Sequence, residues 1–435
     1  MTNNFLERPL GHWLKQPAAN HEEARQTKEV EDAVIPHQWT VHAEIADMGI
    51  DHENHRESPH RVDVFYSLLR HYKCKGTNKC VKSQRLFGFS PISLYLCNMK
   101  ERINWIDWAK ALAVCCVVFC HLPQSQEWFY YRYLQSVIIV IFFFISGYLK
   151  KDRGSDKENW RKYWHGLILP YLLYNAIVYP YWLAKYYLLN GGQPDLFSAM
   201  RPIFGALLFE HENAFCEPLN GPLWYLPAIL FMHITIDLCR KTKYQHVIMI
   251  LLCILSVILY AANKYYYFAP NLTPMGIMKD LPFYYTGYIL GQKRLFNVAN
   301  PIRDLVSCLG LILLSIALFH WHLTTFWVGQ HTLHIVIYYP ACFAFLFGVL
   351  YSCKCLNSFR CSIITNLSTG TLVIIGLHII PITAVNYVLN NLYNLSSTIC
   401  YQWYEALIIA LTITMILYPI ILYSMRRLPV FIGKS

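Results

Sequence analysis

The sequence has few charged residues for its length. Only 14% of its 435 residues are Asp, Glu, Lys or Arg, and 55% are hydrophobic, whereas soluble domains carry about a quarter charged residues. This composition excludes a disordered chain and a collagen-like chain, and the length excludes a small disulfide-stabilised domain. The chain also lacks the basic start and short apolar run of a secretory signal peptide.

A metal-binding pattern is also missing among the 15 cysteines. Several of them lie in apolar segments, where cysteine is most simply a small hydrophobic residue. Cys74 and Cys80 flank a basic turn without a matching second pair, so we expect no zinc or other metal site. Cys216 and Cys400 are the two cysteines expected on the outer side, and whether they form a disulfide is left open.

Charge is distributed unevenly along the chain. Residues 1–98 hold 12 basic and 12 acidic side chains, with eight of the 18 histidines and no apolar stretch long enough to span a membrane. We predict a polar, disordered leader over 1–98 and a membrane domain over 99–435. Met99 is followed by basic residues and is a natural start for a first span, so we expect translation to begin there. The alternative is a disordered cytoplasmic tail.

Residues after Met99 contain ten apolar segments, which predict an all-α integral membrane protein with about ten transmembrane helices. The sixth segment is short and rich in glycine. The segments are 105–123, 133–149, 164–189, 222–239, 246–262, 281–291, 304–320, 333–352, 364–389 and 401–424.

The basic residues between these segments predict the orientation of the helices. With Met99 inside, the cytoplasmic segments collect 19 Lys and Arg and the outer segments collect five. Both ends of the membrane domain are therefore expected inside the cell. Because the positive charge follows this rule, a nucleic-acid partner is not expected.

The first apolar segment contains three residues that are costly in a membrane: Asp107, Lys110 and His121. A charge at the bilayer centre costs roughly 2.5–3.5 kcal/mol on insertion scales, so such residues usually face a cavity and have a function. Eleven residues turn a helix by about 1100°, which places Lys110 and His121 on one stripe, roughly 16 Å apart. Asp107 is close enough in sequence to pair with Lys110. The alternative is that Lys110 reaches the inner surface and His121 lies at the outer interface.

Four elements of the sequence resemble the membrane-bound acyltransferase 3 family. The Lys110-x10-His121 spacing resembles the family's (Arg/Lys)-x10-His motif, within a similar opening at 104–112. The other elements are FFISGY at 143–148, NGPLWYL at 220–226 and LHIIP at 377–381. The resemblance covers about residues 100–425 and is closest to the sugar O-acetylase, fucose 4-O-acetylase-like branch. One departure is His165, which stands nearest Pro170 where family members often carry a basic residue.

This resemblance implies a membrane O-acyltransferase of the bacterial cytoplasmic membrane. It would move an acyl group, most simply acetyl, from cytoplasmic acyl-CoA to a hydroxyl of a cell-surface or lipid-linked carbohydrate. Acyl-CoA is a co-substrate, and no permanently bound cofactor is expected.

The resemblance and the chemistry of the side chains suggest a role for each candidate residue. His121 would act as the general base. Lys110 would stabilise the donor phosphates or maintain the electrostatic field at His121, and Asp107 would orient Lys110. The candidates for binding acyl-CoA are Arg102, Arg161 and Lys162. The candidates for binding the carbohydrate are Trp224, Tyr225, His378 and Ser146.

Simpler interpretations stay open for several of these residues. A buried histidine such as His378 is as often a packing residue, Ser146 with Gly147 suits close helix packing, and Trp224 and Tyr225 suit an aromatic belt. For the whole chain, one alternative is a transporter or flippase, although the second half has no counterpart of the charged stripe. A membrane scaffold or receptor is another alternative. The sequence does not specify the acceptor, the acyl group (acetyl or succinyl) or the oligomeric state.

Overall fold

The structure is a computed structural model that describes residues 102–125, 127–151, 155–190, 192–266, 271–293, 300–327, 331–392 and 399–434. Within these ranges the chain is helical and contains no strand, as the sequence predicts. The predicted leader over 1–98 and the predicted start at Met99 lie outside the described residues.

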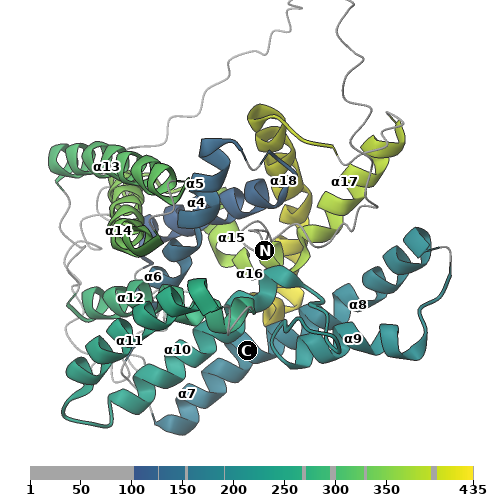
Figure 1. Ribbon diagram of the computed structural model, residues 1–435, viewed down its shortest axis with the longest axis horizontal. Coiled ribbons are helices and arrows are strands. Elements are labelled where there is room, and N and C mark those ends of the chain that lie inside the picture. Colours follow the sequence, from purple (N-terminus) through teal and green to yellow (C-terminus); the bar gives the residue numbers. More distant parts are fainter. Residues whose placement is uncertain are drawn as a thin grey trace, which may run out of the picture. The chain divides into compact units, whose positions relative to one another are not determined.

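The described helices run in chain order from α4 to α18 (Figure 1). In the first half they are α4 (Asn104–His121), α5 (Phe129–Val137), α6 (Ile139–Leu149), α7 (Asp156–Tyr163), a π-helical turn (Trp164–Ile168), α8 (Leu169–Asn190) and α9 (Leu196–Leu207). A 3-10 turn (Gly221–Trp224), α10 (Tyr225–Cys239), α11 (Gln245–Tyr266) and α12 (Leu272–Lys293) follow. The second half consists of α13 (Pro301–Trp327), α14 (His331–Cys355), α15 (Ser362–Thr369), α16 (Thr371–Leu377), α17 (Ile379–Leu392), α18 (Trp403–Arg427) and a 3-10 turn (Pro429–Ile432).

Helix α4 is surrounded by other helices. It packs against α6, α14, α15, α16 and α18, and twelve of its 18 residues are buried. The polar residues Asn104 and Asp107 of this helix therefore lie in the protein interior, which avoids the cost of placing them in lipid.

Helices α6 and α12 approach each other closely because glycine lies at their contact. A Cβ atom on Gly147 would overlap the carbonyl oxygen of Tyr284, and one on Gly287 would overlap that of Phe144. One turn further, Gly291 faces Tyr148 in the same way. Small residues at a helix contact let two backbones come together in a membrane. This packing agrees with the simpler interpretation of the Ser146–Gly147 pair.

Several helices present apolar side chains outward. Large hydrophobic residues are exposed along α11, α13 and α18, for example Leu251, Leu309 and Ile408, which are 59%, 57% and 62% exposed. Continuous apolar surface of this extent marks contact with lipid rather than water. The chain is a multi-pass membrane protein.

Seven of the described helical segments are long and apolar enough to cross a membrane, and the pair α16–α17, bent by 44°, makes an eighth. The other two of the ten predicted segments correspond to α4 and α12, which contain polar and charged residues. All ten predicted segments thus coincide with helix. The exact number of spans and the orientation with both ends inside stay predictions.

Candidate active site

The start of α4 is fixed to the turn that follows α14. Asn104 Nδ2 donates hydrogen bonds of 2.8–3.3 Å to the carbonyl oxygens of Leu356, Asn357 and Phe359. The indole nitrogen of Trp108 also donates to Phe359 O, at 3.0 Å. These bonds hold the end of α4 that carries the predicted Asp107–Lys110 pair.

Lys110 and His121 lie on one unbroken helix, as the spacing requires. Both side chains are half-buried, whereas Asp107 is only 5% exposed. With the rise of an α-helix, the two residues are separated by roughly 16 Å along its axis. The two residues thus lie on one helix at the predicted spacing, and apolar residues between them, such as Val114 and Val117, are buried.

Asp107 has a buried partner on another helix. Its Oδ1 accepts a hydrogen bond of 2.6 Å from the hydroxyl of Ser368 on α15. Asp107 thus joins α4 to α15, because a buried carboxylate must be hydrogen-bonded to be tolerated. Its predicted role in orienting Lys110 stays a prediction.

The structure brings His121 and His378 together. Their ring centroids are 4.7 Å apart and the rings meet edge to face, at 74°. His121 Nδ1 lies 2.7 Å from Val117 O, and His378 Nδ1 lies 2.8 Å from Ile374 O. His378 is completely buried at the bend between α16 and α17.

These contacts determine the tautomer of each neutral imidazole. A carbonyl oxygen can only accept a hydrogen bond, so the proton of each ring is on Nδ1 and each Nε2 keeps a lone pair. His378 Nε2 is buried and has no hydrogen-bond partner among the described residues. The half-buried ring of His121 therefore has the form that a general base needs.

The next candidates, Ser146 and Tyr225, contact each other. Ser146 Oγ lies 3.2 Å from the Tyr225 hydroxyl, and the Tyr225 ring packs edge to face against Phe143 at 5.2 Å. Trp224 is half-buried; it lies 5.9 Å from Phe143 and fills the space above Gly276, which has no side chain. The 143–148 and 220–226 motifs are thus packed together.

The three candidates for binding the donor are exposed. Arg102 lies two residues before α4, and Arg161 and Lys162 lie in the last turn of α7. The π-helical turn Trp164–Ile168 follows directly and contains His165, the residue at which the sequence departs from the family pattern. π-Helical turns inside helices are frequent at functional sites.

A buried ionic cluster beside α7 was missed by the sequence analysis. Lys150 Nζ donates to Asp237 Oδ1 at 2.8 Å, and Lys150 is 8% exposed. The Tyr163 hydroxyl donates to Asp237 Oδ2 at 2.5 Å, and its ring stacks on His233. The signal in the sequence was Asp237, an acidic residue near the end of an apolar segment.

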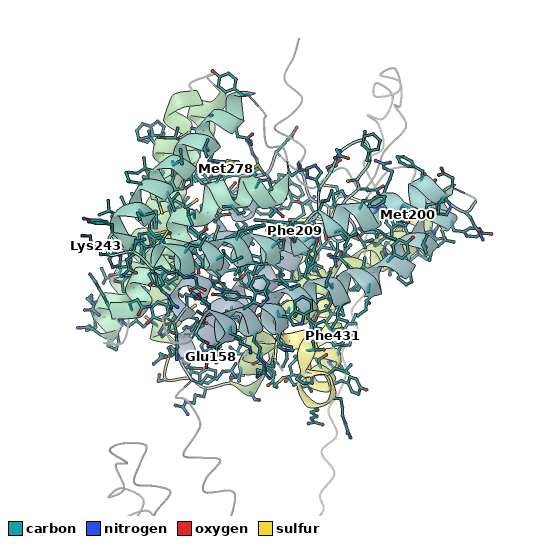
Figure 2. All side chains as sticks on the ribbon, turned by 90° about the horizontal axis from the view of Figure 1, so that it is seen from below. Glu158, Met200, Phe209, Lys243, Met278 and Phe431 are labelled. Atoms are coloured by element: carbon teal, nitrogen blue, oxygen red, sulfur yellow. The ribbon has the colours of Figure 1, made fainter. Side chains whose placement is uncertain are left out.

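The second missed feature is a buried acid in the connection between α9 and the 3-10 turn. Glu210 is 1% exposed, and both Phe209 and Glu210 have a positive φ, 62° and 59°. Figure 2 places Phe209 between Met200 of α9 and Met278 of α12. Such backbone conformations cost of order 1–3 kcal/mol for each residue and persist where the surroundings impose them. Burial raises the pKa of Glu210. No feature of the sequence distinguishes Glu210 from neighbouring Glu212.

Comparison with known proteins decides the family. The family model described as an acyltransferase domain, of the acyltransferase 3 family, matches residues 103–430. The chain belongs to the acyltransferase 3 family. No curated protein and no solved structure matches it. The match covers every α-helix of the membrane domain and part of the last 3-10 turn. This acyltransferase 3 protein is therefore a membrane acyltransferase that works in a lipid bilayer.

Proposed function

We propose that this acyltransferase moves an acetyl group from cytoplasmic acetyl-CoA to a hydroxyl of a cell-surface or lipid-linked carbohydrate. We place it in the bacterial cytoplasmic membrane with both ends of the membrane domain inside. The observation that supports this best is the His121–His378 pair, at one end of an interior helix that also carries Lys110.

His121 is the general base of this reaction. Its Nε2 takes the proton of the carbohydrate hydroxyl while the oxygen attacks the thioester carbonyl. The carbon–sulfur bond then breaks, and the imidazolium returns the proton to the departing CoA thiolate. The hydrogen bond from Nδ1 to Val117 O, 2.7 Å long, keeps the lone pair on Nε2.

Basic residues hold the donor. The exposed side chains of Arg102, Arg161 and Lys162 suit the phosphates of CoA, which attract guanidinium and ammonium groups. The extended pantetheine arm is comparable in length to the distance of roughly 16 Å from Lys110 to His121. The thioester therefore reaches His121 when the phosphates stay near the other end of α4.

The acceptor is held at the end of α4 that carries His121. Trp224, which is half-buried, provides a face for stacking. His378 is completely buried, so it supports the ring of His121 at 4.7 Å and does not touch the carbohydrate. Ser146 and Tyr225 are hydrogen-bonded to each other at 3.2 Å, and this pair supports the residues that contact the carbohydrate.

The test is to replace His121 with alanine in the protein and to measure acetyl transfer to surface glycans. General base catalysis contributes about 10²–10⁴-fold, so we expect O-acetylation of surface glycans, measured by mass spectrometry, to fall by at least about 100-fold. His320→Ala is the matched control, because His320 lies exposed on α13 and should leave transfer unchanged. Normal transfer by His121→Ala at normal abundance would end the proposal.

A further inference from the structure

Glu210 is held by hydrogen-bonding groups from two segments of the chain. Its Oε2 accepts from the backbone N–H of Asn220 at 3.1 Å, and its Oε1 lies 3.2 Å from the hydroxyl oxygen of Tyr171 on α8. Both carboxyl oxygens therefore have a neighbour, and with 1% of the residue exposed no carbohydrate hydroxyl can reach them. Glu210 is placed to support structure and not to touch substrate.

The hydroxyl of Tyr171 has two acceptors within reach. It donates to Ala206 O at 2.5 Å and to Glu210 Oε1 at 3.2 Å, and one hydrogen can be shared between two acceptors. Tyr171 therefore connects the carboxyl group of Glu210 to α8 and to the end of α9.

The cluster reaches the histidine pair through Asn220. Asn220 is 3% exposed, and its Nδ2 donates to Gly376 O at 2.9 Å. Gly376 lies on α16, two residues before His378, and its missing side chain leaves room for the ring of Tyr174. The 208–220 connection thus holds in place the segment of backbone that carries His378.

We propose that Glu210 is a positioning residue that holds Asn220 and, through it, the His121–His378 pair. The order of contact is Glu210, Asn220, Gly376 and then His378, whose ring meets that of His121 at 4.7 Å. The positive φ of Phe209 and Glu210 turns the acid inward at the point where this chain of contacts begins.

The proposal rests on the proposed acetyl transfer, and the test compares two substitutions of one residue. Glu210→Gln keeps a side-chain oxygen that can accept from the Asn220 N–H, so we expect kcat within about threefold of the wild type. Glu210→Ala leaves Asn220 without its partner, and we expect kcat to fall at least about tenfold with KM for acetyl-CoA unchanged. Glu212→Ala, in the same connection but exposed, is the matched control and should behave as the wild type.

Two results would overturn the proposal. Loss of activity in Glu210→Gln equal to that in Glu210→Ala means that an acceptor for the Asn220 N–H is not what Glu210 supplies. Wild-type kcat in Glu210→Ala means that the acid positions nothing. If Glu210→Ala does not fold, Asn220→Ala, which keeps the acid and removes only the bond to Gly376, must show the same fall in kcat.

Hydrogen exchange separates failure of this proposal from failure of the proposed function. If the wild type transfers no acetyl group, the function is wrong, and amide exchange still tests the positioning. We expect Glu210→Ala, but not Glu212→Ala, to speed exchange of the amides of His378 and Ile382, whose bonds to Ile374 O and His378 O are 3.0 and 3.2 Å long. Unchanged exchange in Glu210→Ala would contradict the positioning role.

Discussion

At the scale of single residues, several polar side chains of the membrane domain join distant parts of the chain. Asp107 and Ser368 are 261 residues apart and share a bond of 2.6 Å, and Asn104 binds three carbonyl groups beyond α14. A buried polar group without its partner costs more than the bond itself contributes. Each of these residues is therefore a point where one substitution affects two helices.

The Ser368 hydroxyl gives a direct prediction. Ser368→Ala removes a hydrogen bond from the buried Asp107 carboxylate, so we expect the free energy of unfolding to fall by about 1–3 kcal/mol. Thermal unfolding of the purified protein in detergent measures this change. The control is Ser362→Ala, at the exposed start of the same helix, which should leave the midpoint temperature of unfolding unchanged. Equal midpoint temperatures for both variants would show that the Asp107–Ser368 bond does not contribute to stability.

At the scale of helices, the closest contact is the one between α6 and α12. Glycine occurs on both helices where their backbones meet, at Gly147, Gly287 and Gly291. The 143–148 motif lies on this contact, which places Ser146 against Tyr225 of α10. The spacing of α6 and α12 therefore determines where one wall of the candidate site lies.

Gly287→Ala should force these two helices apart. The added methyl group would overlap Phe144 O, and overpacking of this kind costs typically about 1–3 kcal/mol. We expect a lower thermal midpoint and a lower rate of acetyl transfer. Gly310→Ala is the control, because Gly310 on α13 has open space around its Cβ position and alanine favours a helix; a fall of equal size in both variants would contradict the packing argument.

The helices themselves could be predicted, but their partners could not. Apolar runs of membrane length predict helices, and the x10 spacing predicts that Lys110 and His121 share a face, because both follow from the period of one helix. The meeting of His121 with His378, or of Asp107 with Ser368, depends on how separate helices pack. The inward turn of Glu210 depends on a backbone conformation that no residue preference predicts for Phe209 and Glu210.

At the scale of the whole molecule, apolar helices face outward and α4, which carries the polar residues Asn104 and Asp107, lies inside, as expected for a membrane protein. Charged groups on the described helices are either at helix ends or inside, as with Lys150 and Asp237. The predicted orientation assigns each end of every helix to one side of the membrane, which native cysteines can test.

Cys355 and Cys400 are exposed and are predicted to lie on opposite sides of the membrane. A membrane-impermeant maleimide should label Cys400 in intact cells and Cys355 only after permeabilisation. Cys400→Ser should remove the first signal and Cys355→Ser the second, as read by mass shift on gels. Labelling of Cys355 in intact cells would show that the predicted orientation is wrong.

The burial of α4 has a consequence for the order in which the protein is made. α4 precedes the other helices of the membrane domain in synthesis, yet its polar residues make it a poor candidate for residence in lipid by itself. The groups that satisfy it, from the turn at 356–359 to Ser368, are synthesised more than 250 residues later, since the bonds span 251 to 261 positions. The polar residues at the start of α4 thus meet their partners only after most of the membrane domain has been synthesised, and an early stop in translation would leave them without those partners.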